Sequence, residues 1–473
     1  MKNIFKSDKK IIRPLLKLAA PIMLGNLFQA AYQLTDAFWV GRLGEKAVAA
    51  VAISFPVIFF IISLGIGFSI AGATLTAQYF GAKNEKMVGH STAQTLLIVV
   101  ITASVLSVVG YLMTNTILGW LQVDASIIDN AASYLRISFI GMLFNFSFFM
   151  FQAIMRSINR AKFPVYIVIG TVLLNFFLDP LFMFGSGLIP ALGITGTAIA
   201  TLITQSIAAI IGITSLFVGK QGIKIHWRDF KPDFPFLLKT ARIGLPASLQ
   251  QSARSLSLAV MTGLISSFGT LAVAAYGVSS NILQLSLMIC FGLAGANAAL
   301  VGQKLGANNK EEATNIAKTS IKLIFVALAL IGSLVYIFAP FLIKFFVPND
   351  ANVIKEGARL LRFLAPTFSF IGIQIVVGGT LQAAGATTKA MIMTIASQWF
   401  IQIPLAFLLA KFFGLGITGI WLTFPLTNFV MAIVYLIVFF RGKWKNKDII
   451  NKEEKTKLQV LQETKMDEIV PNE

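Results

Sequence analysis

Long apolar segments alternate with short polar segments along the whole chain, and twelve of the apolar segments are long enough to cross a membrane as a helix. Their apolar residues are continuous, whereas a membrane β-barrel alternates apolar and polar residues. The pattern predicts an all-α polytopic membrane protein with twelve transmembrane helices. The predicted spans lie near residues 18–40, 47–72, 93–115, 131–153, 164–184, 193–217, 243–267, 271–298, 320–341, 363–384, 391–410 and 417–440.

The two halves of the chain repeat each other when one is shifted by 225 residues. The matching pairs are Pro21 with Pro246, Gly44 with Gly269, AVAA at 47–50 with AVAA at 272–275, Gly67 with Gly292, Gln78 with Gln303, and GA at 81–82 with GA at 306–307. LGITG at 192–196 also recurs at 415–419. Matches in one register over this length indicate a duplication.

The repeat contains six spans, so both copies enter the membrane from the same side. Two homologous six-helix lobes should then be related by a pseudo-two-fold axis along the membrane normal, with the substrate path between them. The expected organisation is an N-terminal lobe at 1–218, a linker at 219–242, a C-terminal lobe at 243–441 and a charged, solvated tail at 442–473. One chain with both lobes is expected to function as a monomer.

Charge is scarce and is placed asymmetrically. Charged residues make up 12% of the chain, about half the share of an ordinary soluble domain. Of the 39 Lys and Arg, 30 fall on the side of the N-terminus and seven on the other side, with Arg136 and Arg254 inside spans. This bias predicts a multi-pass protein of the plasma or inner membrane with both termini in the cytoplasm. It also explains the net charge of +19 without a nucleic-acid partner.

No pattern in the chain indicates an enzyme. The motifs of zinc peptidases, nucleotide-binding loops and dinucleotide-binding folds have no credible context here. The single cysteine, Cys290, lies inside an apolar run and is expected to be a packed core residue. The two histidines, His90 and His226, fall in charged loops, so no histidine metal site and no cofactor are expected.

Two acids lie inside predicted spans, Asp36 and Asp179, and a carboxylate at mid-bilayer costs roughly 3 kcal/mol on insertion scales. Tyr32 precedes Asp36 by four residues and Asn175 precedes Asp179 by four, so each pair shares a helix face. Thr197, on the next helix, adds a hydroxyl. Together these oxygens suit a shared proton or a hard cation such as Na⁺. Pro180 is expected to end or kink its helix and to free backbone carbonyls there.

The C-terminal half has no acid in its spans, and Met261 stands at the counterpart of Asp36. Cation coupling is therefore expected in the N-terminal lobe alone. Arg254 needs a helix-end carbonyl, an aqueous cavity or an acid of the other lobe as its partner. The spans of this half are rich in glutamine, which commonly bonds between helices: Gln250, Gln251, Gln284, Gln374, Gln398 and Gln402.

Several stretches resemble the multidrug and toxic compound extrusion (MATE) transporters, and the resemblance runs through all twelve spans. They are LAAPIM, TDAFWVGRLGEKAVAAVAISFPV, YFGAKN, MRSINRAKFP and NFFLDPLFMFGSGLIPALGITGTAIAT. Within them, Asn159 stands where many members place a glycine.

The resemblance implies a V-shaped pair of lobes that exports organic cations or drugs in exchange for H⁺ or Na⁺ by alternating access. It implies that Asp36, Asn175, Asp179 and Thr197 form the coupling-cation site, and hold Na⁺ if the chain is sodium-coupled. The residues matching cavity positions are Tyr32, Tyr134 and Gln152, and Pro21 matches a proline associated with bending of the first helix. We expect Arg254 to line the substrate cavity as well.

Two other functions compete with drug export. A flippase for lipid-linked oligosaccharide or peptidoglycan precursors, from the same superfamily, should show several basic residues in its cavity for pyrophosphate. Arg136 and Arg254 alone within the spans count against it. A membrane-embedded enzyme or scaffold would need a catalytic cluster or a large extramembrane domain.

Overall fold

The computed structural model describes residues 2–187, 190–447 and 449–450, and every element of that part of the chain is a helix. The N-terminal half contains α1 (Lys2–Gly41), α2 (Glu45–Gly81), α3 (Glu85–Trp120), α4 (Ile128–Ser157), α5 (Lys162–Phe184), α6 (Ile194–Val218) and the short η1 (Trp227–Phe230). The C-terminal half contains α7 (Phe234–Ser266), α8 (Thr270–Gly306), α9 (Lys310–Phe346), α10 (Ala351–Leu364), η2 (Ala365–Thr367), α11 (Phe368–Ala383), α12 (Thr387–Ile395), η3 (Ala396–Gln402), α13 (Ile403–Phe407), η4 (Leu408–Phe412), α14 (Gly416–Phe440) and η5 (Lys443–Asn446).

These elements form the twelve predicted spans, because α10 to α11 and α12 to η4 each make one continuous crossing. Eleven helices of the described chain are long and apolar enough to cross a membrane on those criteria alone. The twelfth, α7, falls outside them, although it corresponds to the predicted span 243–267. It carries Gln250, Gln251 and Arg254, and these polar residues line an internal cavity described below.

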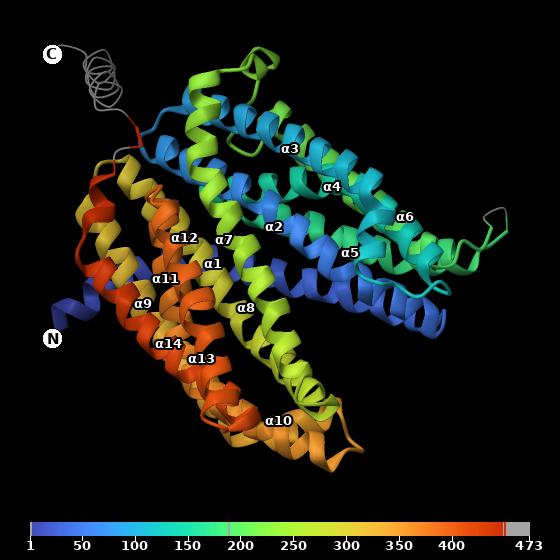
Figure 1. Ribbon diagram of the computed structural model, residues 1–473. Coiled ribbons are helices and arrows are strands. Elements are labelled where there is room, and N and C mark those ends of the chain that lie inside the picture. The colour runs from blue at the N-terminus through green and yellow to red at the C-terminus, as the bar shows by residue number, and fades with distance from the viewer. Residues whose placement is uncertain (1, 188–189, 448, 451–473) are drawn as a thin grey trace, which may run out of the picture.

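The helices form two arms that meet at the upper left of the view and diverge from there (Figure 1). Helices α2 to α6 make one arm and α8 to α14 make the other. Each arm has its own core, a separate cluster of buried apolar side chains. The predicted two-lobed, all-α fold is therefore present, and α1–α6 and α7–α14 are called the N-terminal and C-terminal lobes below.

The first helix of each lobe joins both arms. The early part of α1 contributes Leu15 and Ile22 to the core of the C-terminal lobe, and its later part contributes Tyr32 to the core of the N-terminal lobe. Helix α7 does the reverse, with Phe236 in the N-terminal core and Met261 in the C-terminal core. The arms are thus tied together by two helices that cross between them.

The duplication is visible in the backbone as well as in the sequence. Gly44 and Gly269 precede α2 and α8 with φ of 99° and 98°, a conformation that glycine adopts readily. Asn84 and Asn309 begin α3 and α9, and the side chain of each accepts a hydrogen bond from the backbone N–H three residues on. Both members of each pair are 225 residues apart, as in the sequence repeat.

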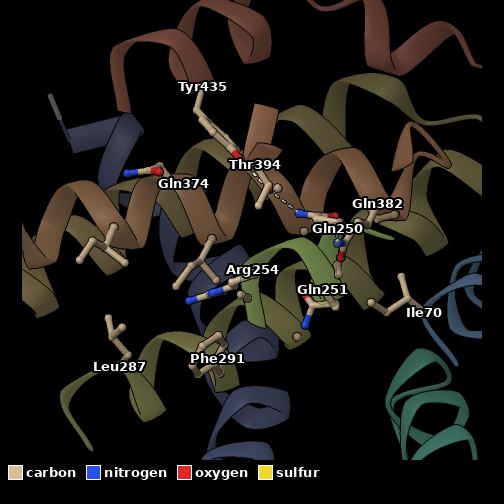
Figure 2. Close-up of a pocket in the computed structure, with 18 of the residues that line it drawn as sticks. Ile70, Gln250, Gln251, Arg254, Leu287, Phe291, Gln374, Gln382, Thr394 and Tyr435 are labelled. Carbon is tan, nitrogen blue, oxygen red and sulfur yellow. Dashed lines mark hydrogen bonds between the residues drawn. The ribbon is translucent and has the colours of Figure 1, made fainter. Parts of the chain in front are cut away.

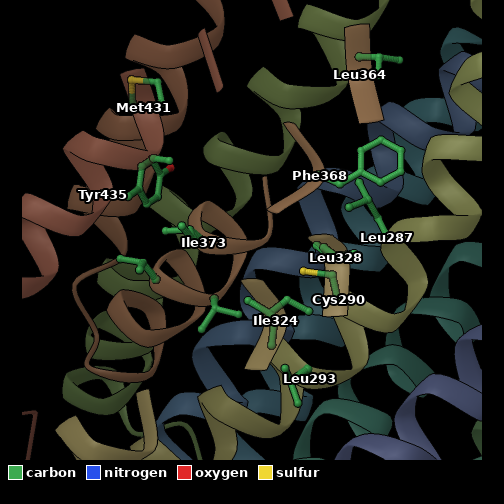
Figure 3. Close-up of a cluster of buried hydrophobic side chains, with 14 of the residues drawn as sticks. Leu287, Cys290, Leu293, Ile324, Leu328, Leu364, Phe368, Ile373, Met431 and Tyr435 are labelled. Carbon is green, nitrogen blue, oxygen red and sulfur yellow. The ribbon is translucent and has the colours of Figure 1, made fainter. Parts of the chain in front are cut away.

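Cys290 belongs to the C-terminal core, as expected. It is a free, fully buried thiol on α8, beside Leu328 of α9 (Figure 3).

Three local expectations need correction. Helix α5 continues through Pro180 to Phe184 rather than ending there, so only the carbonyl of Phe176 loses its α-helical donor. The predicted span 391–410 contains two stretches of π-helix, η3 and η4. Pro404 has no N–H, and the Ile403 N–H before it bonds the carbonyl of Gln398, five residues back.

The third correction concerns the start of the predicted solvated tail. Trp444 is 2% exposed and Ile450 is fully buried, and the Lys447 Nζ donates to the Gly385 carbonyl at 2.7 Å. Ile449 and Ile450 pack into the core of the N-terminal lobe, so this segment links the lobes. The remainder of the predicted tail, 451–473, lies outside the described residues.

Candidate functional site

The two acids of the N-terminal lobe meet between α1 and α5. Asp179 is fully buried and Asp36 is half-buried, and their carboxyl groups lie close enough to interact directly. The Asn175 Nδ2 donates to the Asp179 Oδ1 at 3.1 Å, as their spacing of four residues on α5 allows. The Thr201 hydroxyl on α6 donates to the Asp36 Oδ2 at 3.5 Å. The acid pair is therefore held by three helices.

Four oxygen atoms in this region have no hydrogen-bond partner within the described part of the chain. They are Asp36 Oδ1, Asn175 Oδ1, Asp179 Oδ2 and Thr197 Oγ1. Thr197 is fully buried on α6, and its neighbour Gly196 packs against the α5 backbone at Phe182. Buried polar atoms are normally paired, so a group of unpaired oxygens is a candidate position for a bound donor or cation. A proton or Na⁺ fits this set of oxygens, because hard cations prefer oxygen ligands.

Two tyrosines lie close to the acids. The Tyr32 hydroxyl is 2.6 Å from the Thr204 Oγ1, and a small cavity of about 30 Å³ lies beside Tyr32. Tyr134 on α4 is near enough to both carboxyl groups to interact with them electrostatically. Gln152, also on α4, lines neither of the two cavities described here, so its predicted role stays a prediction.

Pro21 lies inside α1, fifteen residues before Asp36, and the helix continues through it. Beside it, Gly292 of α8 packs so closely on Ala19 and Met23 that a Cβ would meet them. The predicted hinge therefore sits where α1 crosses onto the C-terminal lobe.

A larger cavity of about 430 Å³ lies where the two lobes meet, and it extends into the C-terminal lobe. Its N-terminal wall includes Thr74 on α2 and Arg156 on α4. Its C-terminal wall comes from α7, α8, α11, η3 and α14. Figure 2 shows Arg254 extending from α7 into the space above Phe291, on the side away from Gln251. The volume is in the range that drug-sized ligands occupy.

A chain of hydrogen bonds fixes one wall of this cavity. The Gln382 Nε2 donates to the Gln250 Oε1 at 3.1 Å, and the Gln250 Nε2 donates to the Thr394 Oγ1 at 2.9 Å. The Thr394 hydroxyl is 3.4 Å from the Tyr435 hydroxyl. These bonds tie α11, α7, α12 and α14 together, which is the interhelical role expected for glutamines in membranes.

The charge of the large cavity is entirely positive. Arg254 and Arg156 both line it, and the described residues around it include no Asp or Glu. Neither guanidinium has a hydrogen bond or ion pair with another described side chain. Arg136, the other arginine of a span, lies elsewhere and donates to the Asn115 Oδ1 at 3.2 Å.

The sequence did not single out three residues that the structure brings into these sites. Thr201 and Thr204 hold Asp36 and Tyr32, and only their spacing of four and seven residues after Thr197 on one helix face could have indicated them. Arg156 follows the predicted span 131–153 and so was counted with the loop charges.

Comparison with known proteins gives a consistent result. The MatE family model matches residues 21–181 and 246–408, which is more than half of the chain and includes a segment of each lobe. The probable multidrug resistance protein YoeA of Bacillus subtilis is 29% identical over 448 residues, covering 94% of this chain and 96% of that protein. An FAD transporter of Shewanella oneidensis is 25% identical over 421 residues, covering 89% and 92%.

Solved structures show the same fold. A crystal structure of a MATE protein in complex with MaL6 superposes with a TM-score of 0.86 at 24% identity, covering 92% of this chain and 97% of that one.

Proposed function

Because the chain belongs to the MATE family of membrane transporters, we propose that it exports amphipathic drug-like molecules, organic cations among them, in exchange for H⁺ or Na⁺. The name of the Bacillus relative supports export of drugs, and the name of the Shewanella relative indicates that substrates differ between relatives. The lysine and arginine bias supports a plasma or inner membrane location with both termini in the cytoplasm.

The proposed coupling to H⁺ or Na⁺ rests on the acid pair. Asp36 and Asp179 lie side by side with one unpaired oxygen each, together with unpaired oxygens of Asn175 and Thr197. Two adjacent carboxyl groups cannot both be ionised cheaply away from water. A proton or Na⁺ would relieve that repulsion, and its release would restore it.

The helices that carry the two acids support alternating access. Asp36 lies on α1, which also packs on the C-terminal lobe, while Asp179 lies on α5 within the N-terminal lobe. Binding a cation between them favours a position of α1 close to α5, and losing it favours separation. A substrate that prefers the second arrangement is then exchanged for the cation.

The test uses purified protein in liposomes loaded with a fluorescent organic cation such as ethidium, with a pH gradient and a Na⁺ gradient imposed separately. We expect one of the gradients to drive dye movement and Asp36→Asn to abolish the driven component. Asp124→Asn, on an exposed loop, is the matched control and should transport like the wild type. Gradient-driven transport in Asp36→Asn would contradict the assignment of the coupling site.

The flippase alternative gains one observation from the structure, because two arginines rather than one line the large cavity. If neither gradient moves any of several unrelated dyes, translocation of a lipid-linked phosphate is the function to test next.

A further inference from the structure

We propose that the large cavity binds the anionic group, a carboxylate or a phosphate, of an amphipathic aromatic substrate, and that Arg254 is the residue that recognises it. The inference rests on the proposed export function and names the substrate class more closely. It also implies that a molecule carrying an anion, alone or beside a cationic group, is preferred over a simple organic cation.

The first support is the lack of any partner for Arg254. The guanidinium lies on α7 within a membrane span, and among the described residues no acid lines its cavity and none of its nitrogens has a hydrogen-bond partner. Charged side chains inside membranes are normally paired with an opposite charge or with backbone carbonyls. An unpaired guanidinium that faces a cavity large enough for a ligand is therefore a site for a ligand's anion.

The second support is the charge of the rest of the cavity. Arg156 reaches it from α4 of the opposite lobe, so the two cations approach a bound molecule from both lobes. Two positive charges in a space of low dielectric favour an anionic group over a simple monocation. A guanidinium also matches the planar, two-oxygen geometry of a carboxylate or phosphate.

The remaining walls suit the other parts of such a substrate. Phe291 and Phe424 offer aromatic faces, and Leu283 and Leu287 add apolar surface. Gln251 also lines this cavity, one turn before Arg254 on α7, and its amide has no hydrogen bond to another described residue, so it can contribute a hydrogen bond to a bound ligand. The Gln250 amide is committed to Thr394 and Gln382.

The experiment measures binding to purified protein in detergent by fluorescence anisotropy, with protein-free micelles as the blank. Rhodamine B and its ethyl ester form the probe pair, because they differ only in whether the carboxylate is free. We expect the wild type to bind rhodamine B about tenfold more tightly than the ester, the size of one charge-assisted hydrogen bond. Equal dissociation constants for the two dyes would overturn the proposal.

Variants then assign the preference to a residue. Arg254→Gln should reduce the tenfold preference to about threefold or less, as expected when one charge-assisted hydrogen bond is replaced by a neutral one. Arg254→Lys should keep most of the preference for rhodamine B. This variant also tests the role of Arg254 if Arg254→Gln fails to fold. Arg136→Gln removes an arginine outside the cavity and should leave the preference unchanged. An unchanged preference in the double variant Arg254→Gln with Arg156→Gln would overturn the assignment.

Competition against rhodamine B separates two sources of the anion. Displacement by 4-methylumbelliferyl phosphate but not by 4-methylumbelliferone would assign a soluble substrate, and displacement by dihexanoyl phosphatidic acid but not by the neutral dihexanoylglycerol would assign a lipid headgroup. Equal displacement by the charged and uncharged members of both pairs would overturn the proposal. The binding assay needs no gradient, so its result is independent of the export assay. The protein can therefore lack the anion preference and still export dye under a gradient, or show the preference without such export.

Discussion

In the proposed coupling site, the hydroxyl of Thr197 would serve cation binding at the expense of packing. The side chain is fully buried on α6, yet its oxygen has no partner within the described part of the chain. A buried polar atom left unpaired costs on the order of 1–3 kcal/mol. Removing the hydroxyl should therefore stabilise the fold and weaken the binding of any cation at this position.

Thr197→Val tests this, because valine has the same shape without the hydroxyl. We expect the free energy of unfolding to stay the same or rise by up to about 1 kcal/mol, and Na⁺-driven transport to need severalfold more Na⁺. Thermal unfolding and the liposome assay measure the two effects. Thr204→Val is the control on the same helix: its hydroxyl is bonded to Tyr32, so its loss should destabilise. A large loss of stability in Thr197→Val would show that the hydroxyl is paired after all.

At this scale the sequence was informative about acids and less so about hydroxyls. Asp36 and Asp179 were identifiable because charge is rare in the spans, and the structure brings them together. Thr201 and Thr204 were not, because hydroxyls are common in transmembrane helices and only contacts between helices distinguish them. Asn159 also gains a role: it has φ of 63°, where glycine is usual, and its Nδ2 donates to the Gln303 Oε1 at 3.1 Å.

The helices that cross between the lobes depend on glycine contacts. Gly292 of α8 faces Met23 and Ala19 of α1, and Gly67 of α2 faces the α7 backbone at Ser248 and Gly244. The two contacts are equivalents in the repeat, each beside the proline of the crossing helix. Small residues permit such close approach of membrane helices.

Gly292→Ala should therefore force α1 away from α8, because a Cβ would collide with Met23. We expect a loss of roughly 1–3 kcal/mol in the free energy of unfolding and reduced transport. Gly277→Ala, on the same helix with open space around it, should instead stabilise by up to about 1 kcal/mol. Thermal unfolding of the two variants checks both signs. Equal effects at the two positions would mean that the contact does not constrain the helices.

The repeat and the spans could be predicted from the sequence because apolar length and matched motifs are local signals. The crossing of α1 and α7 could not, because it depends on which lobe each half of a helix packs against. The π-helical turns around Pro404 were missed for a related reason: proline signals that an α-helical bond is lost, not how the backbone adjusts.

For the whole molecule, the contact between the lobes is itself symmetric. Gln78 on α2 donates to the Ala383 carbonyl at the end of α11 at 2.9 Å, and Gln303 on α8 donates to the Ser157 carbonyl at the end of α4 at 2.7 Å. Each glutamine thus binds the last turn of a helix in the opposite lobe. Gly81 and Gly306 let the two helices touch through their backbones at the same place.

This arrangement predicts that the paired glutamines hold the lobes together at the end where the arms meet. The proposed alternating access requires that end to open, so these bonds would break in each cycle. Two neutral hydrogen bonds contribute about 1 kcal/mol each. Gln78→Ala combined with Gln303→Ala should therefore raise the ratio of the separated to the joined arrangement by about thirtyfold.

Spin labels at positions 86 and 311 would measure the change, since both are exposed, near the starts of α3 and α9, and equivalent in the repeat. The native Cys290 is buried and should not react. We expect one distance in the wild type and a second, longer distance in the double variant. Gln284→Ala, an exposed glutamine of α8, is the matched control and should keep the single distance. An unchanged distribution in the double variant would mean that apolar packing and the α1 and α7 crossings alone keep the lobes joined.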